Sequence, residues 1–282
     1  MADNKVAYRK FKDSLFRIAV ISFALITTLP LIFILFYILK QGITAINWHF
    51  LVSLPKPPGE SGGGISNAIV GTFLIVLVAS VLAIPIGIGA GIYLSEYKNS
   101  RLADWARSGL EILNGTPSIV LGIMAYIIVV EPAKGFSAFS GSVALAFMML
   151  PVVIRTTEET LKLMPESLKE AALALGTPYY RVILKVILPS GASGIITGIM
   201  LSVARIAGET APLLFTAFGS PYMNTNIFKP TDSLPLLIFN YATSPYNNWH
   251  QLAWGASLIL VFVILLLNIF SKLAVRKWKV QF

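Results

Sequence analysis

The sequence predicts an all-α protein that crosses a lipid bilayer several times. Of its 282 residues, 56% are hydrophobic and only 12% are charged, which leaves too few polar side chains to cover the surface of a water-soluble domain. The apolar residues form continuous runs and do not alternate with polar ones, so a transmembrane barrel is excluded. The predicted fold class is therefore a polytopic helical bundle.

Six apolar runs account for the predicted spans, since crossing the hydrocarbon core takes about 20 residues of helix. The runs cover residues 18–39, 65–94, 110–130, 139–154, 191–218 and 252–270. The first run is too long and too far from the start to be a cleaved signal peptide, so we expect a retained helix. An even number of spans places both ends of the chain on the same side.

The basic residues indicate which side that is. Of the 22 Lys and Arg residues, 17 lie in the segments before span one, after spans two and four, and in the tail. Four lie in the opposite loops, and Arg205 lies inside a span. Positive charge concentrates on the cytoplasmic side of membrane proteins, so both termini are predicted to be cytoplasmic. The net charge of +9 then needs no nucleic-acid partner to explain it.

Metal and thiol chemistry are not predicted, and no cofactor is expected. The chain has no cysteine, which excludes disulfides and thiolate ligands. Its two histidines, His49 and His250, fall in separate outer loops without a second ligand nearby, so we interpret them as ordinary polar loop residues. The predicted organisation is a cytoplasmic segment at 1–17, a transmembrane domain at 18–272 and a cytoplasmic tail at 273–282.

Two features outside the charged loops matter for packing and for partners. Gly87 and Gly91 in span two, and Gly194 and Gly198 in span five, have the four-residue spacing that lets helices approach closely. The last outer loop, 219–251, is long and rich in proline. Either it binds an external partner protein or it caps the bundle.

The loop at 155–190 is amphipathic and charged, so it is predicted to lie outside the membrane. Apolar residues repeat with helical spacing over 166–175, and Gly176 ends that helix. Thr177 is expected to be the N-cap of a second helix, with Pro178 at its first position. The loop is therefore helix, glycine turn, helix, which offers an apolar ridge to the groove of a partner.

This loop closely resembles the EAA loop of ABC importer permeases. The matching residues are Glu170, Ala171, Ala172, Gly176, Leu188 and Pro189, with Val186 where isoleucine is usual. The resemblance implies the type I permease fold and a coupling helix, at 166–175, that seats in a cytoplasmic ATPase. The permease itself would then hydrolyse no ATP.

Arg205 and Glu209 are the most unusual residues, because a charge inside the membrane costs several kcal/mol. Their four-residue spacing predicts an ion pair on one helical face that is turned toward the bundle interior. Arg205 offers a planar fork of donors that suits an oxyanion. The residues leave two readings open: an anion pathway, or a structural pair that holds span five to a neighbour.

The stretch 204–214, Ala-Arg-Ile-Ala-Gly-Glu-Thr-Ala-Pro-Leu-Leu, is similar to the signature of the A-type permease of bacterial phosphate importers. Segments 115–120 and 150–158 agree with it. The resemblance implies that Arg205 and Glu209 take part in phosphate translocation. It also implies a role for Arg155, although a topological anchor at the cytoplasmic boundary explains that residue more simply.

The resemblance implies an assembly with two ATPase subunits, a homologous C-type permease and an extracytoplasmic phosphate-binding protein, working by alternating access. The rivals within this class are the C-type permease itself and a permease for another oxyanion. A membrane sensor or scaffold that signals through loop 155–190 is the rival from another class. An intramembrane hydrolase is excluded, because the chain has no cysteine and neither a HExxH nor a GxSxG motif.

Overall fold

The computed structural model describes residues 2–60 and 62–277, and every regular element in them is helical. Lys279 and the end of the predicted tail lie outside these residues. Four helices are each long and apolar enough to cross a membrane. These are α1 (Ala2–Gly42), α3 (Ser66–Glu96), α7 (Ala138–Lys162) and α14 (Asn247–Lys277). Together with two bent helix pairs they give up to six spans within the described residues.

The predicted third span is not one straight helix. Residues 110–130 are divided between α4 (Arg101–Gly115), α5 (Ser118–Ala125) and the π-helical turn η1 (Tyr126–Val130), which α6 (Glu131–Ala133) extends. The axis bends by 108° between α4 and the helices that follow it. The cause is Pro117, which forces Thr116 into the extended region and cannot donate to the preceding turn.

The predicted fifth span, 191–218, is also broken. Its helical part, α11 (Ala192–Ile206), ends twelve residues early and is followed after a break by the short α12 (Ala211–Leu214). At its other end α11 meets the helical stretch Tyr179–Ser190 at an angle of 69°. Gly191 and Gly208 flank α11, and Pro212 begins the segment after it, so neither flank favours a continuous helix.

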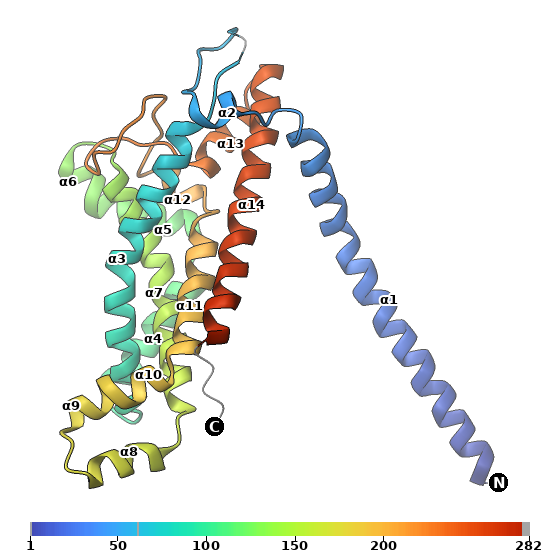
Figure 1. Ribbon diagram of the computed structural model, residues 1–282, viewed down its shortest axis with the longest axis vertical. Helices are drawn as coiled ribbons and strands as arrows, with labels where there is room; N and C mark the ends of the chain where they lie inside the picture. Colours follow the sequence, from blue (N-terminus) through green and yellow to red (C-terminus); the bar gives the residue numbers. More distant parts are fainter. Residues whose placement is uncertain (1, 61, 278–282) are drawn as a thin grey trace.

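Five more α-helices and one π-helical turn complete the described residues, at the outer end and in the predicted coupling loop. The outer end carries α2 (Trp48–Val52) and α13 (Leu234–Ala242). The coupling loop contains α8 (Glu166–Ala174), α9 (Tyr179–Val182), the π-helical turn η2 (Ile183–Ile187) and α10 (Leu188–Ser190). In Figure 1 the first turns of α1, the last turns of α14 and the coupling loop all lie toward the same end of the molecule.

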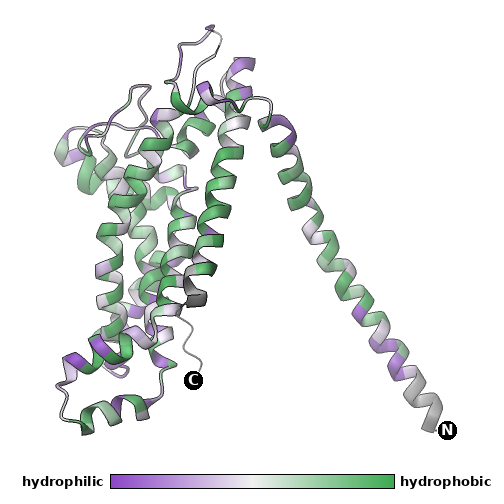
Figure 2. Cartoon of the chain, viewed as in Figure 1, coloured by the Kyte–Doolittle hydropathy of each residue, from purple (hydrophilic) through white to green (hydrophobic). Residues whose placement is uncertain are grey.

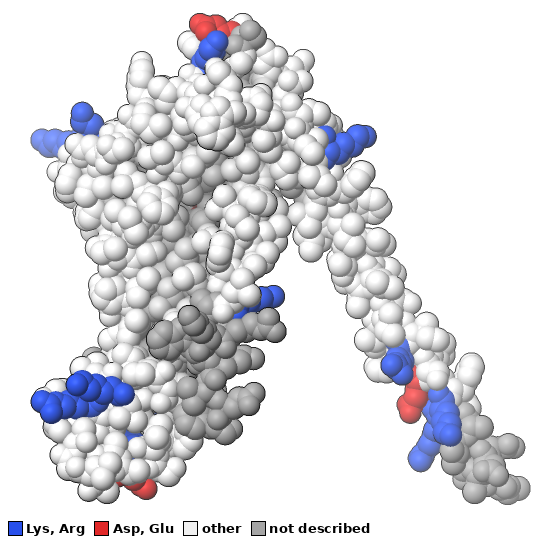
Figure 3. All heavy atoms as spheres, viewed as in Figure 1, with Lys and Arg blue, Asp and Glu red and all other residues white. Residues whose placement is uncertain are grey.

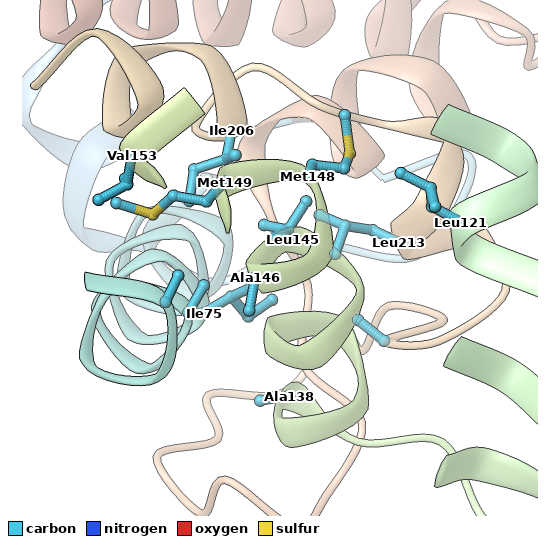
Figure 4. Close-up of a cluster of buried hydrophobic side chains, with 13 residues drawn as sticks. Ile75, Leu121, Ala138, Leu145, Ala146, Met148, Met149, Val153, Ile206 and Leu213 are labelled. Carbon is cyan, nitrogen blue, oxygen red and sulfur yellow. The ribbon is translucent and has the colours of Figure 1, made fainter. Parts of the chain in front are cut away.

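The bundle is centred on α7. Side chains of α3, α5, α11 and α12 surround it and form a buried apolar cluster that includes Ile75, Leu145, Met149, Ile206 and Leu213 (Figure 4). The middle of the bundle is green in the hydropathy view, and the polar residues gather toward its two ends (Figure 2). Lys and Arg follow the same division on the face shown in Figure 3, where most of the central belt is uncharged.

The glycine spacings seen in the sequence do serve close helix packing. A Cβ on Gly91 of α3 would lie 2.5 Å from the Cβ of Thr157 on α7. A Cβ on Gly198 of α11 would lie 2.1 Å from Oγ1 of Thr156, also on α7. Since real Cβ atoms do not approach so closely, only glycine lets α3 and α11 sit at this distance from α7.

Helix α1 stands apart from the bundle. It diverges from α14 and approaches it only near the outer end, where the rings of Tyr37 and Trp254 meet edge to face at 5.1 Å (Figure 1). None of its most apolar 18-residue window is buried within the chain. The helix therefore leaves nearly all of its apolar surface for lipid or for another protein.

Candidate functional site

The candidate site lies where α11 ends, because the backbone turns away from the helix between the two charged residues. Gly208 N–H bonds to the carbonyl of Arg205, and Glu209 N–H bonds to that of Ile206, which closes the last turn tightly. Helix α12 then begins at Ala211, with Pro212 as its second residue. The helix is thus broken near Gly208, and Arg205 and Glu209 lie on the two sides of the break.

Arg205 and Glu209 face each other across this break. Arg205 Nε lies 4.0 Å from Glu209 Oε1, which is an ion pair but too long for a hydrogen bond. The side chain of Glu209 is 21% exposed, whereas that of Arg205 is 52% exposed. Arg205 therefore retains most of its donors for another partner.

The prediction that Arg205 faces the bundle interior is wrong for this chain. The inward face of α11 is occupied by Ile195, Gly198, Ser202 and Ile206, which are buried against α7 and its neighbours. The outward face carries Thr197, Leu201, Arg205 and Gly208 in one exposed stripe at helical spacing. We call these four residues the α11 stripe.

Arg155 lies inside α7, because that helix continues past the predicted end of span four at residue 154 and ends at Lys162, three residues before Pro165. Its Nε donates to Oε1 of Glu159 at 2.9 Å, and both side chains are 61% exposed. The next residue, Thr156, packs on Gly198, seven residues before Arg205 and so about 10 Å from it along α11. Arg155 and Arg205 thus belong to one helix pair but to separate ion pairs.

Beside Arg155 lies a second charged cluster that the sequence did not reveal. Glu158 of α7 accepts hydrogen bonds at Oε1 from Arg107 Nε at 2.9 Å and from Lys162 Nζ at 2.5 Å. Arg107 also bonds to the carbonyl of Leu94 at 3.1 Å. A cavity of about 170 Å³ lies between this cluster and Arg155. Arg107 and Glu158 are 51 positions apart in the sequence, so no local pattern indicates that they pair.

The predicted coupling loop has the expected helix, turn and helix. Gly176 has φ of +76°, a conformation that side chains other than glycine rarely adopt, and it separates α8 from α9. The prediction for Thr177 is wrong: Pro178 is the N-cap residue, and no side chain caps α9. Leu188 and Pro189 form most of α10, where the loop turns back toward α11.

Helix α8 keeps part of its apolar surface exposed. Leu168 and Ala172 pack inward, against the cluster formed by Leu161, Val182 and Ile187. Glu170 and Ala171 are exposed, and so are Leu173 and Leu175, the latter at 86%. The predicted apolar face is therefore divided, with one half holding α8 to its own chain and the other half open.

The outer end has a cavity of about 590 Å³ that was not predicted from the sequence. Asp232 lies at its inner wall, with Tyr222, Tyr241, Trp249 and Lys56 among the other lining residues. Burial raises the pKa of the Asp232 carboxyl to about 7, although the hydrogen bond from Ser233 N–H favours the charged form.

The histidines are not brought together. His250 bonds through Nε2 to the carbonyl of Ser244 at 2.7 Å, and His49 lies in α2. Among the described residues, no group of three His, Asp or Glu side chains is placed to hold a metal ion.

The chain resembles known transport proteins in sequence and in fold. Residues 83–279 match the family described as binding-protein-dependent transport system inner membrane component. A "Phosphate transport system permease protein PstA" from Yersinia pestis is 44% identical over 276 residues, covering 98% of this chain and 94% of that protein. A "Probable phosphate transport system permease protein PstA" from Methanocaldococcus jannaschii is 37% identical, covering 91% of each chain.

Among solved structures, an inward-facing MetNI methionine ABC transporter has a chain with the same fold, at a TM-score of 0.65 and 17% identity. The match covers 77% of this chain and 96% of that one. Since the family match covers residues 83–279 and the sequence identity extends over nearly the whole length, the chain belongs to the binding-protein-dependent transport system inner membrane components, in their PstA branch.

Proposed function

We propose that this chain is a permease subunit of an ATP-driven importer and that it passes inorganic phosphate across the cell inner membrane. The observation that carries the substrate is the Arg205–Glu209 pair at the break after α11, with an arginine that is half exposed. A planar guanidinium with unused donors suits a tetrahedral oxyanion. The relatives named as phosphate transport permeases support the same substrate.

A homologous C-type permease is the partner we assign to the α11 stripe. An arginine on the outer surface of an apolar bundle would be costly in lipid, and a second permease facing it would enclose both the arginine and the anion. The uncovered surface of α1 supports a large protein contact in the membrane as well. The pathway would then lie between the two permeases rather than inside this one.

Two ATPase subunits provide the energy in this proposal, one of them through α8. The exposed half of α8, with Leu173 and Leu175, offers apolar side chains to a groove beside the negative charge of Glu170. The long outer loops would receive an extracytoplasmic phosphate-binding protein. The permease itself catalyses no reaction and holds no cofactor.

The mechanism follows from the break at Gly208. When the ATPases close, they displace α8, and the tightly packed α3, α7 and α11 move with it. Because α11 ends between Arg205 and Glu209, a tilt of α11 changes the distance between the two charges. Glu209 then competes with the anion for Arg205, which lets the site release phosphate after accepting it.

The test is uptake of radiolabelled phosphate into proteoliposomes that contain the complete complex. We expect ATP-dependent uptake that requires the binding protein and is inhibited by excess arsenate more strongly than by molybdate. Inhibition by molybdate alone would identify another oxyanion as the cargo. If no oxyanion is taken up although ATP is hydrolysed, the transport proposal fails.

A further inference from the structure

Glu96 is the last residue of α3, and it holds both helices of the coupling loop. Its Oε2 accepts a hydrogen bond from Nζ of Lys169 on α8 and another from the hydroxyl of Tyr179 on α9. Lys169 also lies over the Tyr179 ring, with 4.8 Å between the ammonium and the ring centroid. One carboxylate, one ammonium and one phenol therefore form a closed group of three contacts, which we call the Glu96 clamp.

The ion pair of the clamp is less exposed than its neighbour, whereas Tyr179 at its edge is 45% exposed. The side chain of Glu96 is 13% exposed and that of Lys169 is 27% exposed. The other ion pair between the same segments, Lys98 with Glu166, is 3.8 Å long, and its side chains are 51% and 83% exposed. Water and salt screen the exposed pair, so the Glu96 clamp is the stronger connection.

Two kinds of contact join α3 to α8: polar side-chain contacts, and an apolar cluster on which both Ile92 of α3 and Leu168 of α8 pack. A cavity of about 500 Å³ lies between the end of α3 and the start of α8, with both ion pairs in its wall. In sequence, 72 residues separate Glu96 from Lys169, whereas α8 is connected directly to α7 and α9. A displaced α8 would therefore move α7 through the backbone, and its direct polar connection to the last residue of α3 is Glu96, beside the shared apolar cluster.

We propose that Glu96 is the positioning residue through which movement of the coupling helix is transmitted to α3. Helix α3 packs on α7 through Gly87 and Gly91, and α7 packs on α11 through Thr156 and Thr160. Pulling the end of α3 together with α7 keeps α3 and α7 aligned while α11 tilts. Without the clamp, the end of α3 follows α8 less closely, so ATP is hydrolysed with less transport.

This inference rests on the proposed function, and the experiment separates the two. The complete complex is reconstituted with wild-type chain, Glu96→Gln, or the charge reversal Glu96→Lys with Lys169→Glu. The measured quantity is phosphate transported per ATP hydrolysed. Lys98→Gln, which breaks the exposed pair in the same cavity from outside α8, is the matched control.

We expect Glu96→Gln to lower transport per ATP about three- to tenfold, the range typical of coupling between sites, without lowering ATP hydrolysis. The charge reversal should recover part of the loss, because it restores the Lys–Glu pair. Transport per ATP in the control should stay within about twofold of the wild-type value, as expected for an exposed ion pair.

Wild-type transport per ATP in Glu96→Gln overturns the inference, and so does an equal loss in Lys98→Gln. If Glu96→Gln does not assemble, Tyr179→Phe provides the second measurement, since it removes only the hydroxyl contact to Glu96. A wild-type ratio in Tyr179→Phe would then overturn the inference. Failure of the wild-type complex to transport phosphate would instead contradict the proposed function.

Discussion

Arg107 donates from Nε to Oε1 of Glu158 at 2.9 Å, and this hydrogen bond joins α4 to α7 beside an apolar cluster that includes Ala103 and Ile154. Glu158 is the less exposed partner, at 8%, and also accepts from Lys162. A buried carboxylate with two cationic donors is a strong local restraint, because losing it leaves Arg107 with the exposed Asp104 as its remaining counter-charge. The bend between α4 and α5 is held from the α4 side by this contact.

We therefore expect Glu158→Gln to lower the free energy of unfolding by about 2–3 kcal/mol. This loss is smaller than for a buried ion whose partners are all removed, since Arg107 keeps its hydrogen bonds to backbone carbonyls. Glu159→Gln is the matched control on the next residue. Its partner Arg155 is exposed, so that change should cost less than about 1 kcal/mol. Unfolding in detergent measures both, and equal losses would contradict the account.

Gly91→Ala tests the packing of α3 on α7. The added methyl group would meet Thr157 Cβ at 2.5 Å and the carbonyl oxygen of Ile154 at 2.8 Å. We therefore expect the free energy of unfolding to fall by about 1–3 kcal/mol. Gly89, two residues away on the same helix, has open space at that position. Gly89→Ala should stabilise the helix by up to about 1 kcal/mol, and a lower unfolding midpoint there would argue against the packing explanation.

Asp232 predicts a pH dependence of stability. Its folded pKa of about 7 lies above the ordinary value of 3.8, so the folded state binds more protons between those two pH values. Stability contributed at this site is then greatest at low pH and falls as the pH rises from about 4 to about 7. Asp232→Asn should raise the unfolding midpoint at pH 8 and change it little near pH 4.

The control for this prediction is Glu131→Gln, which removes an exposed carboxylate in α6. It should leave the difference between pH 4 and pH 8 as in wild type. The account of Asp232 would be wrong if Asp232→Asn lowered the midpoint at pH 8. That result would indicate that the carboxylate is charged and stabilising in the folded chain, for example through Lys56, which lines the same cavity.

The helical class and the two helices of loop 155–190 could be predicted from the sequence because they depend on local patterns. Gly176 separates two amphipathic stretches, and its positive φ is a property of the residue itself. The four-residue spacing of Gly91 from Gly87, and of Gly198 from Gly194, predicted the close helix packing. The bend at Pro117 had a local signal too, but hydropathy averages over a proline and predicts one continuous span.

Other features depend on which helices meet, and no local pattern contains that information. Glu96 looks like an ordinary residue at a helix end, and its partners Lys169 and Tyr179 come much later in the chain. The orientation of Arg205 was mispredicted for a related reason. Its spacing to Glu209 indicates a shared face, but the packing of Ser202 and Ile206 on α7 decides which way that face turns.

The most direct test of the central claim is phosphate uptake by the complete complex carrying Arg205→Gln. The change keeps the size of the side chain nearly constant and removes its charge and its fork of donors. The control is Thr197→Val, on the same α11 stripe, whose hydroxyl bonds only to the carbonyl of Ser193 within the helix.

If the anion passes Arg205, uptake should fall about tenfold or more in Arg205→Gln, which corresponds to at least about 1.4 kcal/mol of lost binding. Assembly and basal ATP hydrolysis should persist, and Thr197→Val should transport as wild type does. Wild-type uptake by Arg205→Gln would contradict the account, because it would make the Arg205–Glu209 pair a structural contact and place the anion path elsewhere.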